Sequence, residues 1–152
     1  DTIQPLPGNL YLACDNLSDP GNAGTIIRTA DWFGIKHLFF SENSVDIYNP
    51  KVVSAAKGSL FRVQCHYVDL KQMLNHDPAI TVYGACMNGS DLYTEKLATS
   101  AIIVIGNEAN GIREELTPFI KHKLSIPNFG KAESLNAAVA AGIIMGEFRR
   151  RM

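Results

Sequence analysis

Short apolar runs alternate with segments of helical periodicity along the whole chain, and this alternation restricts the folds open to it. Residues 80–87 and 101–107 are apolar and β-branched, which is typical of strands buried on both faces. Within residues 21–33 the apolar side chains recur at the spacing of one helix face. The alternation predicts an α/β domain with a mostly parallel sheet flanked by helices.

The expected elements can be placed from period, caps and turn residues. Strands are expected at 10–16, 37–41, 62–68, 80–87, 101–107 and 123–126. Helices are expected at 21–33, 50–58, 69–75, 113–120 and 133–151. Asp69 and Ser134 are natural N-caps for the third and last of these helices. No repeat or linker interrupts the pattern, so residues 1–152 are expected to form a single domain.

Composition narrows the class of protein. Apolar residues make up 46% of the chain and charged residues 19%, which is a soluble globular composition. No apolar stretch is long enough to cross a bilayer, and no signal peptide is recognisable, so a cytoplasmic protein without a membrane partner is expected. The three cysteines (14, 65 and 86) form no metal-binding pattern with any of the four histidines (37, 66, 76 and 122), so no metal is expected. The net charge of −1 lacks the basic excess of most nucleic-acid binders.

Three turns hold most of the unusual polar residues. In open α/β sheets, ligands bind where the carboxyl ends of strands meet the next helix. The first turn, 15–30, contains an Asp-Pro-Gly signal and reaches Arg28, which an ordinary capped helix with a surface ion pair would also explain. The second, 105–112, has two glycines and suits a ligand gripped by backbone amides, although a plain turn is equally compatible. The third, 125–138, leads into a helix of small residues that could simply be buried.

Together the three turns closely resemble the signature motifs of SpoU-type methyltransferases of the SPOUT superfamily. The matches are Asn-Ala-Gly-Thr-Ile-Ile-Arg-Thr-Ala at 22–30, Ile-Gly-Asn-Glu-Ala-Asn-Gly-Ile at 105–112, and Ile-Pro-Asn at 126–128 continued by 133–143. Residues 57–62 look like the family's intervening glycine-containing segment. The resemblance implies a C-terminal trefoil knot, a homodimer, and transfer of a methyl group from S-adenosylmethionine to a ribose 2′-hydroxyl of transfer or ribosomal RNA.

The resemblance also implies roles for individual residues. The expected catalytic residues are Arg28, Asn22, Glu108, Ser134 and Asn136. The expected donor-binding residues are Ile105, Gly106, Asn107, Gly111, Ile126 and Leu135. The expected RNA-binding cations are Arg28, Lys57, Arg62, Arg113 and Lys131. Arginine stays protonated, so Arg28 is expected to hold a phosphate and stabilise the developing alkoxide, with Glu108 anchoring Arg28 or Asn22.

Two other functions remain open at this point. A non-catalytic RNA-binding or assembly module could retain the fold, although it would be free to lose the polar residues of the three motifs. An α/β enzyme with a nucleotide cofactor is disfavoured because the chain lacks a Gly-x-Gly-x-x-Gly loop and a phosphate-loop lysine. The sequence does not choose between transfer and ribosomal RNA. Since many relatives carry a separate N-terminal RNA-binding domain, part of the substrate recognition is expected to lie outside this chain.

Overall fold

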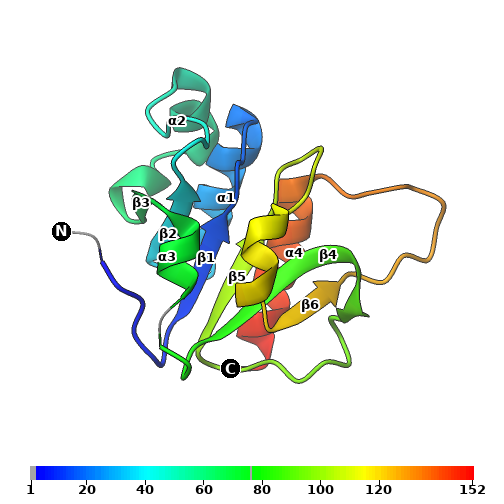
Figure 1. Ribbon diagram of the computed structural model, residues 1–152. Helices are drawn as coiled ribbons and strands as arrows, with labels where there is room; N and C mark the ends of the chain where they lie inside the picture. The colour runs from blue at the N-terminus through cyan, green and yellow to red at the C-terminus, as the bar shows by residue number, and fades with distance from the viewer. Residues whose placement is uncertain (1–2, 76) are drawn as a thin grey trace.

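A computed structural model describes residues 3–75 and 77–152, and in this part of the chain six parallel strands form one sheet (Figure 1). The order across the sheet is β3-β2-β1-β5-β4-β6. The strands are β1 (Leu10–Cys14), β2 (His37–Ser41), β3 (Gln64–Val68), β4 (Thr81–Asp91), β5 (Ala101–Ile105) and β6 (His122–Ser125). The α/β prediction with a parallel sheet is confirmed.

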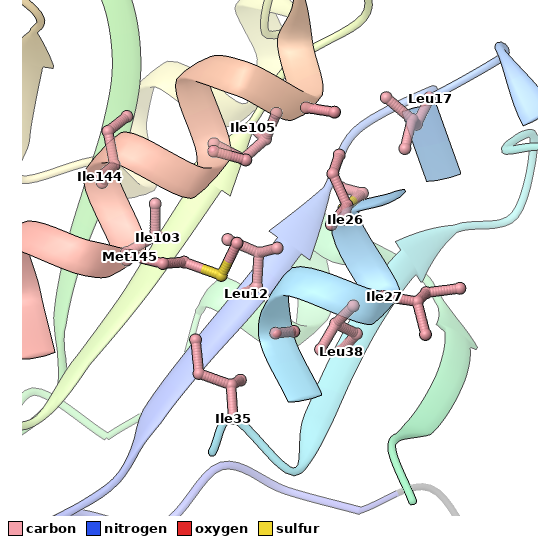
Figure 2. Close-up of a cluster of buried hydrophobic side chains, with 14 of the residues drawn as sticks. Leu12, Leu17, Ile26, Ile27, Ile35, Leu38, Ile103, Ile105, Ile144 and Met145 are labelled. Atoms are coloured by element: carbon pink, nitrogen blue, oxygen red, sulfur yellow. The ribbon is translucent and has the colours of Figure 1, made fainter. Parts of the chain in front are cut away.

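Helices cover both faces of the sheet. They are α1 (Pro20–Trp32), α2 (Pro50–Ala56), α3 (Leu70–Leu74) and α4 (Ala137–Arg150), with 3₁₀ turns η1 (Ser59–Phe61) and η2 (Glu114–Phe119). The larger core lies under α1, α2 and α4, and the smaller core lies under α3 and η2. In Figure 2, Met145 of α4 reaches Leu12 of β1, and all the labelled side chains belong to this larger core.

The centre of the sheet aligns the ends of two strands that lie far apart in sequence. All ten residues of β1 and β5 are buried, and Cys14 pairs with Ile105 at the last position of each strand. Parallel strands end at the same edge, so the loop that follows β1 lies beside the loop that follows β5. The amide of Asp15 continues the pairing by donating to the Ile105 carbonyl at 2.8 Å.

Several predicted boundaries are wrong, for local reasons. The last helix begins at Ala137 instead of 133, because Asn136 caps it by accepting from the amides of Ala138 and Val139 at 2.9 and 3.2 Å. The segment expected as a helix at 113–120 is a 3₁₀ turn, and it contains Pro118, which cannot donate a helical hydrogen bond. The predicted cap Asp69 is confirmed.

The strand expected to end at 87 continues as β4 to Asp91. Its pairing with β6 shifts register between Ala85 and Ser90, so residues 86–89 bulge out of the ladder. A bulge bends the strand and redirects its side chains. At Gly89 an added Cβ would lie 2.6 Å from the Lys123 carbonyl carbon, so a glycine allows β6 to approach. At the other side of the sheet, β3 begins at Gln64, two residues later than the predicted 62.

Helices α1 and α2 approach each other closely at Gly24. A Cβ built there would lie 2.5 Å from the Cβ of Ala55 and 2.6 Å from the carbonyl oxygen of Val52. Real side chains do not tolerate such distances, so the glycine of the first motif is required for helix packing. Within the described residues, none of the helices has the length and apolar character needed to span a membrane.

Candidate functional site

A cavity of about 490 Å³ opens at the carboxyl edge of the sheet, among the ends of β4, β5 and β6 and the start of α4. Its volume is in the range of small-molecule sites, about 300–1,000 Å³. The residues predicted to bind the methyl donor all line it, namely Ile105, Gly106, Asn107, Gly111, Ile126 and Leu135. Two of the predicted catalytic residues, Glu108 and Ser134, also line it.

The loop 106–112, which follows β5, folds back tightly on itself. Asn107 and Gly111 exchange two backbone hydrogen bonds of 3.0 and 2.9 Å, and Gly111 has a φ of 71°, which favours glycine. At Gly106 an added Cβ would lie 2.3 Å from both the Gly111 carbonyl carbon and the Ile112 nitrogen. The Asn107 side chain accepts from the amides of Ala109 and Asn110, so the turn is stabilised from within.

Glu108 ties this loop to the loop that follows β1. Its carboxylate accepts from the Ser18 amide at 3.2 Å, the Ser18 hydroxyl at 3.0 Å and the Asp19 amide at 2.9 Å. Partial burial alone would raise the pKa of Glu108, but these hydrogen bonds outweigh it and the pKa lies below its ordinary value. The carboxylate therefore anchors Ser18 and Asp19, instead of the expected Arg28 or Asn22.

The first and third motifs meet through two asparagines. Nδ2 of Asn136 donates to Oδ1 of Asn22 at 2.9 Å, although the two residues are 114 positions apart. The backbone of Asn22 is fixed in turn, because its amide donates to Oδ1 of Asp19, the cap of α1. The structure therefore places the starts of α1 and α4 side by side, with both amide side chains at the surface beside the cavity.

Arg28 lies on the solvent side of α1, away from the cavity lining. Among the described residues its guanidinium forms neither an ion pair nor a side-chain hydrogen bond, so the surface ion pair considered above is not found. Ser134 is exposed at the rim of the cavity and does not cap α4. The structure therefore brings Glu108 and Ser134 to the cavity and Asn22 and Asn136 together, while Arg28 lies apart from both.

The remaining predicted RNA-binding cations differ in their exposure and in whether they form ion pairs within the protein. Lys57 and Lys131 are exposed, and Lys57 has a left-handed backbone with a φ of 51°. Arg62 pairs with Asp31 at 2.8 Å. Hydrogen bonds from Arg62, and then from Ser59, lower the pKa of Asp31.

Arg113, by contrast, is half-buried and paired with two carboxylates of the protein. Its Nε donates to Asp15 at 2.7 Å and its Nη1 donates to Glu115 at 2.6 Å. Asp15 was missed in the sequence, although a carboxylate directly after a wholly apolar strand is an unusual feature. Cys86 and Met87 also line the cavity and were missed, because the bulge of β4 that places them there cannot be read from the alternation.

The described residues contain no group of three or more His, Cys, Asp or Glu side chains that could hold a metal ion. His76 lies outside this part of the chain. The three cysteines are free thiols. The cavity is thus lined mainly by aliphatic side chains and by the backbone of the 106–112 loop, with a few polar groups at its rim, and it suits an uncharged ring with polar edges better than a phosphate.

Comparisons with known proteins agree with this description. The model of the SpoU rRNA methylase family matches residues 9–146. The 23S rRNA (guanosine(2553)-2′-O)-methyltransferase RlmP of Bacillus subtilis is 35% identical over 91% of this chain and 57% of its own length. A structure from Porphyromonas gingivalis, assigned to the TrmH family of RNA methyltransferases, superposes with a TM-score of 0.91 at 42% identity over 99% of this chain and 62% of its own.

A second solved structure holds a ligand. The S-adenosylmethionine-bound rRNA methyltransferase of Sinorhizobium meliloti superposes with a TM-score of 0.90 at 32% identity, covering 99% of this chain and 59% of its own. The chain therefore spans somewhat more than half the length of these relatives. The family match covers most of the chain, including all three motif loops, and the two superpositions show the same fold. The chain belongs to the SpoU rRNA methylase family.

Proposed function

We propose that this domain transfers a methyl group from S-adenosylmethionine to a ribose 2′-hydroxyl of RNA. The observation that carries the proposal is the cavity at the carboxyl edge, because all six residues expected to bind the donor line it together. The named activities of the relatives, and the donor bound in the Sinorhizobium structure, support the same chemistry. Ribosomal RNA is the favoured substrate class, since the RlmP relative acts on 23S rRNA.

The chain's residues fit the donor. Ile105, Ile126 and Leu135 offer apolar surface for an adenine ring, and the compact turn at Gly106 exposes backbone groups that can hydrogen-bond its edge. The Asn107 side chain and backbone amide are both used within the protein, so Asn107 offers a ligand only the second acceptor lone pair of its carbonyl oxygen. When bound, the donor supplies an electrophilic methyl group on a sulfonium.

The acceptor side is assigned to Arg28, Ser134 and the Asn22–Asn136 pair. In the overall reaction the ribose oxygen gains the methyl group and loses its proton, while the sulfonium becomes a neutral thioether. A guanidinium cannot accept that proton, so Arg28 binds the neighbouring phosphate and stabilises the developing charge on the ribose oxygen. The proton leaves through phosphate or water. Lys57 and Lys131 add exposed positive charge for the RNA backbone.

We propose that the domain works as a homodimer that brings Arg28 to a cavity. Helices α1 and α4 run side by side, as the contacts Asn22–Asn136 and Phe33–Gly146 show. Their solvent faces carry apolar side chains, including Trp32, 84% exposed, and Val139, 51% exposed. Arg28 lies on the same face of α1 as Trp32, so a second copy packed here would carry Arg28 toward its partner's cavity. We expect the wild-type protein to sediment as a dimer and the Trp32→Glu variant to sediment as a monomer.

We also propose the C-terminal trefoil knot that the family resemblance implies. In support, the end of α4 is held under the segment joining β4 to β5, where Arg151 donates to the carbonyls of Leu92 and Glu95. A crystal structure in which the chain, closed through its ends, reduces to a simple loop would contradict the knot. We also propose a cytoplasmic location, because the RlmP relative is a bacterial enzyme that acts on 23S rRNA.

The test is transfer of labelled methyl from S-adenosylmethionine to ribosomal RNA, with transfer RNA as the comparison. Arg28→Ala should lose most transfer while keeping donor affinity, and Arg28→Lys should recover only part of it because the planar fork is lost. Lys96→Ala, an exposed cation away from the site, is the matched control. Full transfer by a folded Arg28→Ala protein would refute the assignment. Donor binding without transfer to either RNA would favour a non-catalytic RNA-binding module.

A further inference from the structure

A wholly buried carboxylate stands directly after β1, and the proposed chemistry does not use it. Asp15 has 0% exposure. Its Oδ2 accepts from the backbone amide of Arg113 and its Oδ1 from Nε of the same arginine, both at 2.7 Å. Removing the Arg113 side chain would leave one oxygen of the buried Asp15 carboxylate without its partner, which is far costlier than losing a surface pair. Asp15 and Arg113 thus form one unit.

The Asp15–Arg113 pair holds the C-terminal end of the 106–112 loop, which lines the cavity. The loop starts at Gly106, at the end of β5, and the Asn107 side chain donates to the Asn16 carbonyl at 2.7 Å. It ends at Ile112, and the next residue is Arg113. Gly106, Asn107, Gly111 and Ile112 all line the cavity. The residues that shape the donor cavity are therefore pinned to the end of β1 on both sides, at Asn16 and at Asp15.

Arg113 is itself oriented for this task. Its Nη1 donates to Glu115 at 2.6 Å, so the guanidinium bridges two carboxylates, and its side chain is only 34% exposed. A side chain held this way has little freedom to reach a phosphate. Glu108 makes a separate connection, from the middle of the loop to the amides of Ser18 and Asp19. It therefore fixes the segment that leads into α1 and not the end of the loop.

We propose that Asp15 is a positioning residue for the donor site: through Arg113 it fixes the 106–112 backbone in the shape that binds S-adenosylmethionine. This inference rests on the proposed function for the identity of the ligand. A loop that is already ordered before the donor binds loses little conformational entropy on binding. The Asp15–Arg113 pair should therefore act on the affinity for the donor. It acts much less on RNA affinity or on the methyl-transfer step at saturating donor.

The first readout is donor binding and kinetics in Asp15→Asn. The amide retains one acceptor for Nε of Arg113 but turns an NH₂ group toward the Arg113 amide, so one of the two hydrogen bonds is lost. The Kd for S-adenosylhomocysteine by calorimetry, and the KM for the donor, should rise about tenfold or more. The kcat at saturating donor and the KM for ribosomal RNA should change by less than about threefold. Arg113→Lys, which keeps the charge but loses Nε, should show the same pattern.

The second readout is hydrogen exchange of the unliganded protein. In both variants the amides of 106–112 should exchange faster, while those of β2 and α2 stay as in the wild type. Asp31→Asn is the matched control, because it breaks the Arg62 ion pair at the surface without touching the loop. Arg113→Lys also covers the case in which Asp15→Asn does not fold.

The outcomes are separable. Lower stability in both variants, with unchanged donor affinity and unchanged exchange at 106–112, would overturn the positioning role and leave Asp15 as a purely structural residue. A wild-type protein that fails to bind S-adenosylhomocysteine would refute the proposed function instead. In that case the exchange rates at 106–112 still decide whether Asp15 positions the loop.

Discussion

Two helical glycines that look alike in sequence should respond in opposite directions to alanine. Gly24 lies in α1 and Gly142 lies in α4. In both helices alanine gains about 1 kcal/mol of intrinsic helix preference over glycine. At Gly142 a Cβ would make an ordinary contact, 3.5 Å from Cγ2 of Thr29, so Gly142→Ala should stabilise the protein by up to about 1 kcal/mol.

At Gly24 the same methyl group would enter occupied space. It would lie 2.5 Å from the Ala55 Cβ and 2.6 Å from the Val52 carbonyl oxygen, and one of those atoms is backbone. Overpacking of a core costs about 1–3 kcal/mol, which cancels or exceeds the helix gain. Since the helix term is common to both variants, Gly24→Ala should be less stable than Gly142→Ala by about 1–3 kcal/mol.

Urea unfolding followed by circular dichroism measures this difference directly. Equal m-values in the two variants would show that the midpoint shift reports stability and not a change in the surface exposed on unfolding. The reasoning would be refuted if Gly24→Ala were as stable as Gly142→Ala. That result would mean that α2 can shift away from α1 at little cost, and that the first-motif glycine is retained for ligand binding instead of packing.

Other residues give shorter tests. Burial, and then the neighbouring His37, lower the pKa of His66, so the folded state favours the neutral imidazole. The contribution of this imidazole to protein stability is complete above pH 6.5 and is lost as the pH falls below that value. His66→Gln should therefore flatten the fall in melting temperature between about pH 7 and 5. Hydrogen bonds from Arg150, and then from Arg151, lower the pKa of Glu147 from 4.5 to about 2, so the stabilisation that its carboxylate provides is present above pH 4.5 and lost toward pH 2; Glu147→Gln should reduce the acid-induced loss of stability in that window, and an unchanged acid unfolding profile would contradict it. Asn136→Ala should lower the free energy of unfolding by about 1 kcal/mol or more by removing the α4 cap, whereas Ser134→Ala should leave it within about 0.5 kcal/mol.

The sequence was informative where structure depends on neighbours along the chain. Strand–helix alternation predicted the α/β class, and Asp69 was found because a cap acts on amides two and three residues away. The start of α4 was misplaced because Ser134 and Asn136 are both competent caps. Asn136 is the cap in the structure, and its side-chain amide also donates to Asn22. The two residues are 114 positions apart, so no local sequence pattern indicates this contact.

The site shows the same division between local and distant information. The residues expected to bind the methyl donor were chosen through motifs that resemble a known family, and the structure brings all six of them to one cavity. The pairing of Arg113 with Asp15 was not predicted, because it depends on β5 lying next to β1 in the sheet. Sheet order is a property of the whole chain, and no window around Asp15 or Arg113 contains it.

The pairing of β1 with β5 also sets a delay during synthesis of the protein on the ribosome. Tyr11 emerges about ninety residues before its partner Ile102, which at about 5–20 residues per second is a wait of roughly 5 to 20 s. Throughout that time one edge of β1 has no strand to bond, and the strand is apolar on both faces. Nascent chains ending before Ala101 should therefore be the forms most prone to aggregate and most dependent on chaperones.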